Sequence, residues 1–294
     1  MTPTVGRLRA LALVGLLTTV ACGPNNAASP ASPTAPSVPS AAASAPPTSA
    51  PRESVTFKSD TLELHGFIWK PAGPGPFPAV LWNHGGDDAA SATYYDKLWP
   101  PHVRAGFLFF IPQRRGQGGS PGVSVNTQFN RAPAADRNRM QVELYSTVAL
   151  GDQSAALAYL MTRPDVDVSR IAVSGWSAGG QLTLIGAEAD PGYKVAVACS
   201  SASVSWDGSP ELQQRLVATV AKIKIPVFLF QAQNDYSLNP QKVLGAEFKR
   251  MGKRYEEMVY PPHGASAQDG HAFCVDAPEI WGDRVTTFIR NNMP

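Results

Sequence analysis

Hydrophobic residues along this chain form short runs that alternate with longer amphipathic segments. The runs predict strands at 54–59, 62–69, 79–82, 107–111, 171–173, 195–198, 227–230 and 255–260. The amphipathic segments predict helices at 92–104, 142–161, 181–188, 240–251 and 278–289. In the second helix, Asp152 and Gln153 are expected on the polar face. The first two strands alternate apolar and polar residues, and the strands from 79–82 to 227–230 are continuous apolar runs. The pattern therefore predicts an α/β fold: a mostly parallel twisted sheet of about eight strands, with helices on both faces.

One turn between a predicted strand and a predicted helix carries candidate chemistry. It reads Gly175-Trp176-Ser177-Ala178-Gly179. This pattern is typical of a nucleophile elbow, a sharp turn that holds its serine in a strained backbone conformation. Small neighbours let the strand and helix approach closely, and the helix N-terminus favours negative charge. Ser177 is the candidate nucleophile; the alternative is an ordinary glycine-rich turn.

A catalytic serine needs a base to take its proton, and the base needs an acid to orient it. After such an elbow the chain order is serine, acid, histidine. Asp235 follows the predicted strand at 227–230, so it should lie at the same sheet edge as Ser177. It is the predicted acid, with Asp269 and Asp276 as alternatives.

Two histidines follow the predicted acid. His271 comes just before the last helix, and the adjacent Gly270 should give its loop the freedom to reach Ser177, so His271 is the predicted base. His263, just past the last strand, is the alternative; otherwise it is a surface loop residue. Two other histidines, in a predicted strand and a predicted helix, are expected to have no role: His65 and His102.

Acyl transfer also needs donors for the developing oxyanion, and backbone N–H groups usually supply them. One is expected from Ala178, directly after the nucleophile. The other is expected from the loop after the strand at 79–82, where Gly86 is favoured and Asp87 is the alternative. His84 in that loop is expected to be structural. The sequence has no metal-ligand spacing and no phosphate-binding glycine loop, so no metal or other cofactor is expected.

The N-terminus reads as an export signal, because Arg7 and Arg9 precede an apolar run too short to span a bilayer. Small residues then lead to Cys22, which resembles the bacterial lipobox. That resemblance implies a signal peptide at 1–21, lipid on Cys22 and a membrane anchor; the alternative is an ordinary secretory signal. Residues 22–52 have the composition of an unfolded tether. Residues 53–294 form the predicted catalytic domain.

Net charge bears on the binding partners of the protein, and cysteine content bears on its disulfides. The chain has 25 Lys and Arg against 23 Asp and Glu, so nucleic-acid binding is not expected. Lipidation of Cys22 would leave Cys199 and Cys274. Cys199 ends a central strand at the carboxyl edge, and Cys274 follows His271 closely. In an oxidising compartment they form a candidate disulfide, with two free thiols as the alternative.

Together these motifs resemble the α/β-hydrolase fold, in its dienelactone hydrolase and prolyl-oligopeptidase-like branch. The resemblance runs from about residue 54 to the C-terminus. It rests on His84-Gly85-Gly86, the turn at 115–120, the approach to Ser177 at 167–180, and His271-Ala272-Phe273. It implies the Ser177, Asp235 and His271 triad. Dienelactone enzymes of this branch use a cysteine nucleophile, so Ser177 is a departure that favours ordinary ester or amide substrates.

The function expected is therefore a serine hydrolase of the carboxylesterase type acting on a small-molecule ester. A peptidase or amidase on the same machinery is the second possibility, and a non-catalytic binding module is the third. The short connection between 199 and 225 predicts a minimal cap and an open site. The stretch 121–139 is the expected specificity loop. Its arginines should face either an anionic substrate or solvent: Arg131, Arg137 and Arg139.

Overall fold

The computed structural model describes residues 51–86 and 95–293. The proposed signal, Cys22, the proposed tether up to residue 50 and the alternative donor Asp87 lie outside the described residues. The strands are β1 (Glu53–Ser59), β2 (Leu62–Trp69), β3 (Phe77–Asn83), β4 (Leu108–Pro112), β5 (Val166–Trp176), β6 (Tyr193–Cys199), β7 (Val227–Ala232) and β8 (Tyr255–Tyr260).

Helices connect the strands. They are α1 (Trp99–Arg104), α2 (Val125–Asn130), the 3-10 turn η2 (Ala134–Asp136), α3 (Arg137–Leu144), the π-helical turn η3 (Tyr145–Ala149), α4 (Leu150–Thr162), α5 (Ala178–Ala189), α6 (Pro210–Lys222), α7 (Asn239–Arg250), α8 (Ala267–Asp276) and α9 (Pro278–Asn292).

The eight strands form one sheet in the order β1-β2-β4-β3-β5-β6-β7-β8. β1 and β2 are antiparallel, and the six strands from β4 to β8 run parallel. This is the predicted fold. The carboxyl ends of β5, β6 and β7 therefore meet at one edge, where open α/β sheets bind ligands.

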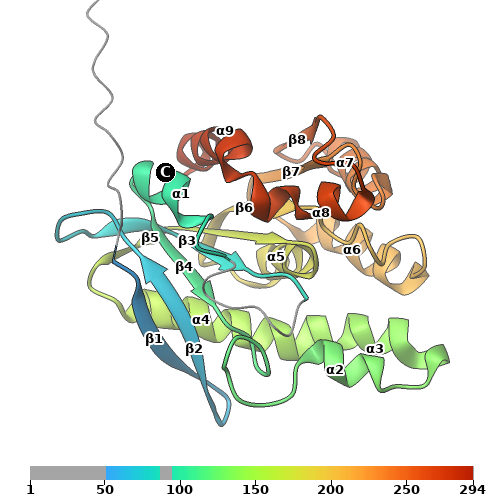
Figure 1. Cartoon of the computed structure of the whole chain (residues 1–294), viewed down its shortest axis with the longest axis horizontal. Helices are drawn as coiled ribbons and strands as arrows, with labels where there is room; N and C mark the ends of the chain where they lie inside the picture. Colours follow the sequence, from blue (N-terminus) through green and yellow to red (C-terminus); the bar gives the residue numbers. More distant parts are fainter. Residues whose placement is uncertain (1–50, 87–94, 294) are drawn as a thin grey trace, which may run out of the picture. The chain divides into compact units, whose positions relative to one another are not determined.

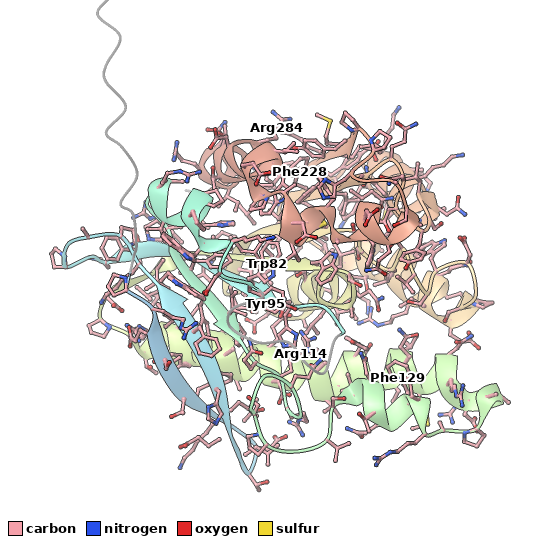
Figure 2. All side chains as sticks on the ribbon, in the orientation of Figure 1. Trp82, Tyr95, Arg114, Phe129, Phe228 and Arg284 are labelled. Atoms are coloured by element: carbon pink, nitrogen blue, oxygen red, sulfur yellow. A yellow bond between two sulfur atoms is a disulfide. The ribbon has the colours of Figure 1, made fainter. Side chains whose placement is uncertain are left out.

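Helices cover the sheet on both faces and create two separate cores (Figure 1). On one face, residues of α4, α5, α6 and α7 pack against alternate strand residues such as Leu81 and Val173. On the other face, α1, α8 and α9 supply Val103, Phe273 and Trp281. Large aromatic side chains fill this second layer (Figure 2), and Trp281 stacks on Trp82 with ring centroids 6.0 Å apart.

The predicted helix at 142–161 differs from the observed one in an instructive way. The helix is interrupted at η3, and Asp152 and Gln153 are buried rather than solvent-exposed. Asp152 receives hydrogen bonds from Ser59 and from the Arg115 guanidinium, at 2.7 Å each. Gln153 accepts one from Asn83. The prediction of a polar face was wrong because distant partners satisfy these groups inside the protein.

Three helices were not predicted: α2, α6 and α8. The helix expected at 92–104 is described only as α1, because residues 92–94 lie outside the described part. Ser209 is the N-cap of α6, and its hydroxyl accepts from the Leu212 N–H; Pro210 follows at the first helical position. Both are standard helix-start signals. This helix fills the short connection between β6 and β7.

Candidate active site

Ser177 lies in the turn between β5 and α5, with φ of 58° and ψ of −121°. A positive φ is costly for a residue with a side chain, and the surrounding backbone holds it there. The Ser177 N–H donates to the Cys199 carbonyl at 2.9 Å. A Cβ on Gly179 would collide with the carbonyls of Asn83 and His84, so only glycine lets α5 pass this close to β3.

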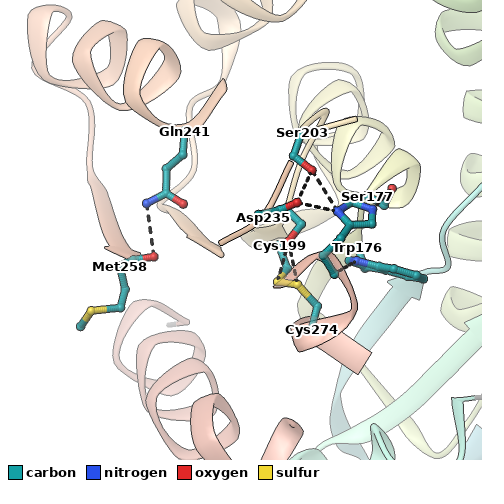
Figure 3. The surroundings of a disulfide bond; sticks show 10 residues. Trp176, Ser177, Cys199, Ser203, Asp235, Gln241, Met258 and Cys274 are labelled. Carbon is teal, nitrogen blue, oxygen red and sulfur yellow. Dashed lines mark hydrogen bonds and ion pairs between the residues drawn. A yellow bond between two sulfur atoms is a disulfide. The ribbon is translucent and has the colours of Figure 1, made fainter. Parts of the chain in front are cut away.

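The structure brings the three predicted residues together at the carboxyl edge of the sheet (Figure 3). Ser177 Oγ lies 2.9 Å from His271 Nε2, and His271 Nδ1 lies 2.9 Å from Asp235 Oδ1. A carboxylate only accepts hydrogen bonds, so Nδ1 carries the proton and Nε2 is free to accept from the serine hydroxyl. The Asp235 side chain is fully buried and that of His271 is 7% exposed. This arrangement can move a proton from Ser177 onto His271.

Ser203 is a fourth member of this network that the sequence did not indicate. Its hydroxyl donates to Asp235 Oδ1 at 2.8 Å and lies 2.9 Å from His271 Nδ1. The Tyr236 N–H donates to the same carboxylate oxygen at 2.7 Å. Ser203 comes from the connection between β6 and α6, and Asp235 from the turn after β7. The carboxylate is therefore fixed by two donors besides the imidazole.

His271 lies on helix α8, not in the flexible loop that was predicted. Gly270 serves close packing instead of loop freedom, because a Cβ there would lie 2.5 Å from the Asn234 carbonyl carbon. The Trp176 indole N–H donates to the His271 carbonyl at 2.7 Å. A disulfide joins Cys199 at the end of β6 to Cys274 on α8, with Cα atoms 6.2 Å apart (Figure 3). Two long-range links thus attach the histidine helix to the sheet edge.

The alternative site residues lie in structural roles. Asp269 closes the capping box at the start of α8 with Ser266, whose hydrogen bonds hold the pKa of Asp269 below its usual range. Asp276 pairs with Lys97. His263 lies in a loop, where its backbone N–H donates to Asn234. None of these side chains is in contact with Ser177 in the described network.

The two histidines that were expected to have no catalytic role are His65 and His102. His65 is exposed on β2. His102 is fully buried in α1, donates through Nδ1 to the Leu98 carbonyl, and stacks on Phe109 with centroids 4.4 Å apart. Burial lowers the pKa of His102 to about 4, so its imidazole is neutral in the folded protein.

Gly86 and Ala178 lie side by side at the mouth of the site. A Cβ on Gly86 would be 3.5 Å from the Ala178 Cβ. Ala178 is the first residue of α5, where backbone N–H groups have no intrahelical partner. The Asn126 side-chain amide donates to the Gly86 carbonyl, and Asn126 Oδ1 accepts from the Tyr145 hydroxyl at 3.0 Å. These two side chains fix the orientation of the Gly86 carbonyl.

His84 lies beneath this loop and is completely buried. The Arg114 guanidinium donates to the His84 carbonyl at 3.0 Å and to the Gly85 carbonyl at 2.6 Å. Burial, together with the nearby Arg114 charge, holds the pKa of His84 well below its usual value. His84 thus has the surroundings of a structural residue that supports the loop.

A pocket of about 280 Å³ opens beside Ser177. Its walls come from β5 and α5, from the predicted specificity stretch and α3, and from the connection after β6. The lining residues are Gly86, Asn126, Phe129, Gln141, Tyr145, Trp176, Ser177, Ala178, Gln181, Ala202, Val204 and Ser205. The stretch 121–139 reaches it through Asn126 and Phe129.

The three arginines of that stretch do not line the pocket. Arg137 donates to the Ala132 carbonyl, and Arg139 pairs with Asp136 and Glu143. Arg131 is exposed just after α2. The structure therefore favours the prediction that these arginines face solvent over the prediction that they face an anionic substrate.

Residues 51–86 and 95–293 contain no cluster of three or more His, Cys, Asp or Glu side chains that could hold a metal ion. No helix there is long and apolar enough to cross a membrane.

Sequence comparison identifies the family to which this fold and this candidate site belong. The chain belongs to the dienelactone hydrolase family, whose model matches residues 65–287. It is 30% identical over 156 residues to thiohydrolase apmlB of Arthrinium phaeospermum, covering 53% of this chain and 45% of that protein. The chain thus spans less than half the length of this curated relative.

Solved structures with low sequence identity share the fold. An acylaminoacyl peptidase of Pyrococcus horikoshii superposes with a TM-score of 0.62 at 18% identity, covering 83% of this chain and 42% of the peptidase. An esterase of Pyrococcus furiosus superposes with a TM-score of 0.61 at 17% identity, covering 83% and 92%. Both kinds of hydrolase therefore use this architecture.

Proposed function

We propose that this protein is a serine hydrolase that cleaves carboxylic esters through an acyl-enzyme intermediate. The single observation that carries the proposal is the chain of contacts from Ser177 Oγ through His271 to Asp235, each 2.9 Å long. The family membership supports a hydrolase but leaves the nucleophile open. A serine in the strained elbow conformation, within hydrogen-bond reach of a base, supports Ser177 in that role.

In the proposed reaction, Ser177 Oγ attacks the ester carbonyl carbon while His271 Nε2 takes the hydroxyl proton. The carbonyl oxygen becomes negative and accepts hydrogen bonds from the N–H groups of Ala178 and Gly86. The tetrahedral intermediate then collapses, the alcohol leaves with the proton from His271, and Ser177 remains acylated. Water, deprotonated by His271, then attacks the acyl carbon. The bond between this carbon and Ser177 Oγ breaks, the carboxylic acid leaves, and Ser177 takes the proton back from His271.

Asp235 has an electrostatic and orienting role in this scheme. Its buried carboxylate keeps the proton of the neutral imidazole on Nδ1 and stabilises the imidazolium that forms during each transfer. Ser203 and the Tyr236 N–H hold the carboxylate in place. We assign Ser203 as a positioning residue because its hydroxyl contacts both the acid and the base.

An amide or peptide substrate is the second candidate, because the acylaminoacyl peptidase shares the fold. The same steps would then expel an amine instead of an alcohol. A thioester is chemically closer to an ester, and the curated relative is named a thiohydrolase. An oxygen ester remains the primary proposal. A serine nucleophile with its base and acid cleaves such an ester without any additional chemical group.

We further propose that the enzyme is exported and anchored to a bacterial membrane by lipid on Cys22. The basic residues, short apolar run and small residues before Cys22 support this. A lipid-modified terminus gives a stable anchor without a spanning helix. Metabolic labelling with a lipid precursor tests it: label should enter the wild type and be lost in Cys22→Ser. Equal labelling of both proteins would refute the anchor.

The test of the catalytic proposal compares p-nitrophenyl acetate with an aminoacyl p-nitroanilide. We expect Ser177-dependent hydrolysis of the ester and slow or undetectable cleavage of the anilide. Ser177→Ala is the control and should lower kcat on the ester by about three orders of magnitude or more. Faster cleavage of the anilide would favour the peptidase, and activity that survives Ser177→Ala would remove the serine mechanism.

A further inference from the structure

The pocket beside Ser177 is lined by neutral side chains. Among its lining residues, all within the described part of the chain, there is no Asp, Glu, Lys, Arg or His. The lining instead combines the aromatic rings of Phe129, Tyr145 and Trp176 with carboxamides. Its volume of about 280 Å³ lies near the lower limit for pockets that bind small molecules. These properties match a small, uncharged group.

The position of the pocket indicates which side of the scissile bond it receives. Gly86 and Ala178 line it together with Ser177, but His271 does not. The leaving group must lie beside His271 Nε2, because this nitrogen hands it a proton. A pocket that is lined by the nucleophile and by both proposed oxyanion donors, but not by the imidazole, is therefore assigned to the acyl side.

Gln181 is the buried polar group of this pocket that lacks adequate partners. It lies on α5 one turn after Ser177, and only 2% of its surface is exposed. Its Oε1 has no hydrogen-bond partner. Its Nε2 is 3.4 Å from Ser205 Oγ, longer than an ordinary N–H···O hydrogen bond. A buried amide oxygen without a hydrogen-bond donor costs free energy. A ligand that supplies such a donor therefore binds more favourably.

We propose that Gln181 marks an acyl subsite for an uncharged group that donates a hydrogen bond, such as a hydroxyl or an amide N–H. Gln141, on α3, reaches the same pocket with a second carboxamide. The subsite would not favour a carboxylate, since Arg137 and Arg139 are held by other partners outside the lining. This inference rests on the proposed esterase function and specifies its substrate class.

Two matched pairs of p-nitrophenyl esters test the subsite. The N-acetylglycyl and 4-oxopentanoyl esters differ only by N–H against CH2, and the 3-hydroxybutanoyl and 3-methylbutanoyl esters by O–H against CH3. After subtraction of spontaneous hydrolysis, at least one donor-bearing ester should exceed its partner in kcat/KM by about tenfold, as expected for one neutral hydrogen bond. The pair that responds identifies whether the donor is an amide or a hydroxyl. The hemisuccinyl ester, which carries a carboxylate, should be the slowest.

Variants connect the preference to Gln181. Gln181→Leu keeps the volume, removes both polar atoms and should bring the preferred pair to nearly equal kcat/KM. Gln181→Met is the second variant should Leu prevent folding, because its flexible side chain adapts to irregular spaces. Gln213→Leu is the matched control: this glutamine lies on α6 outside the pocket and bonds the Trp206 carbonyl. The control should retain the wild-type preference.

The outcomes separate this inference from the proposed function. Ser177-dependent hydrolysis without any preference within either pair would overturn the subsite and leave the esterase intact. So would an equal loss on both members of a pair in Gln181→Leu, or fastest hydrolysis of the hemisuccinyl ester. Absence of Ser177-dependent hydrolysis of every ester would overturn the proposed function, and the subsite with it.

Discussion

The nucleophile elbow and the histidine helix present Ser177 and His271 to each other, but different kinds of contact position these two residues. Ser177 is placed by its own neighbours in sequence: strand β5, helix α5 and the glycines between them. His271 is placed by contacts that are distant in sequence. The Trp176 hydrogen bond spans 95 residues, and the disulfide spans 75.

Because of this difference, we expect changes in the elbow and changes in the supports of α8 to impair catalysis in different ways. Damage to the elbow changes the backbone that presents the nucleophile. Damage to the supports of α8 should leave Ser177 in place and loosen the base beside it.

Removal of the base should have the largest effect. His271→Ala should lower kcat by about three orders of magnitude or more, leaving residual catalysis from the oxyanion donors. His263→Ala is the matched control and should stay close to wild type. Steady-state kinetics on p-nitrophenyl acetate provide the measurement. Near-full activity in His271→Ala together with loss in His263→Ala would show that the base is wrongly assigned.

Removal of the disulfide should weaken the histidine helix more than the elbow. Closing a loop of this length stabilises a protein by about 4 kcal/mol in the chain-entropy model, so the Cys199→Ala/Cys274→Ala variant should unfold at lower urea concentration. We also expect a several-fold lower kcat, because α8 loses a covalent link to β6. Reductant should reproduce both effects in the wild type and have no effect on the variant. Unchanged unfolding and kinetics after complete reduction would contradict this role.

Ser203→Ala should have a moderate effect on the chemical step. Loss of the donor to Asp235 should lower kcat about tenfold, in the range of one hydrogen bond to a charged group, with KM nearly unchanged. Ser203→Thr retains the hydroxyl and should restore part of the loss. A lower melting temperature with normal kcat would instead assign Ser203 a purely structural role.

The smallest effect concerns a histidine that is remote from this edge. The pKa of His102 is lowered to about 4 in the folded protein, whereas an unfolded histidine titrates near 6.5. Between these values the unfolded chain binds a proton that the folded chain does not, so stability should fall as pH drops from about 6.5 to 4. The contribution is full above pH 6.5. His102→Gln should flatten this decline, measured by urea unfolding at several pH values; parallel curves for both proteins would contradict the assignment.

Much of the fold could be predicted from the sequence because its central strands are continuous apolar runs. β8 has the predicted bounds 255–260, β6 starts two residues earlier and ends one residue later than predicted, and β7 ends two residues later. Ser177 could be predicted because the glycines that its turn requires, Gly175 and Gly179, lie within two positions of it.

The rest of the site depends on contacts that a linear pattern does not contain. The sequence predicts a solvent-exposed Asp152, because its partner Arg115 lies 37 residues away and is not part of the local pattern. The pocket residues Asn126, Tyr145 and Gln181 come from three separate elements. The helical position of His271 did have a signal, since Ser266 and Asp269 have the spacing of a capping box. From the sequence, Asp269 is predicted only as an alternative catalytic acid.

Covalent labelling with an active-serine phosphonate tests the central claim most directly, because it reports an activated nucleophile without requiring the natural substrate. The labelled protein is digested and the modified residue identified by mass spectrometry. We predict stoichiometric label on Ser177, none on Ser203, and labelling slowed by orders of magnitude in His271→Ala. Label on another residue, or equal rates in wild type and His271→Ala, would contradict the account.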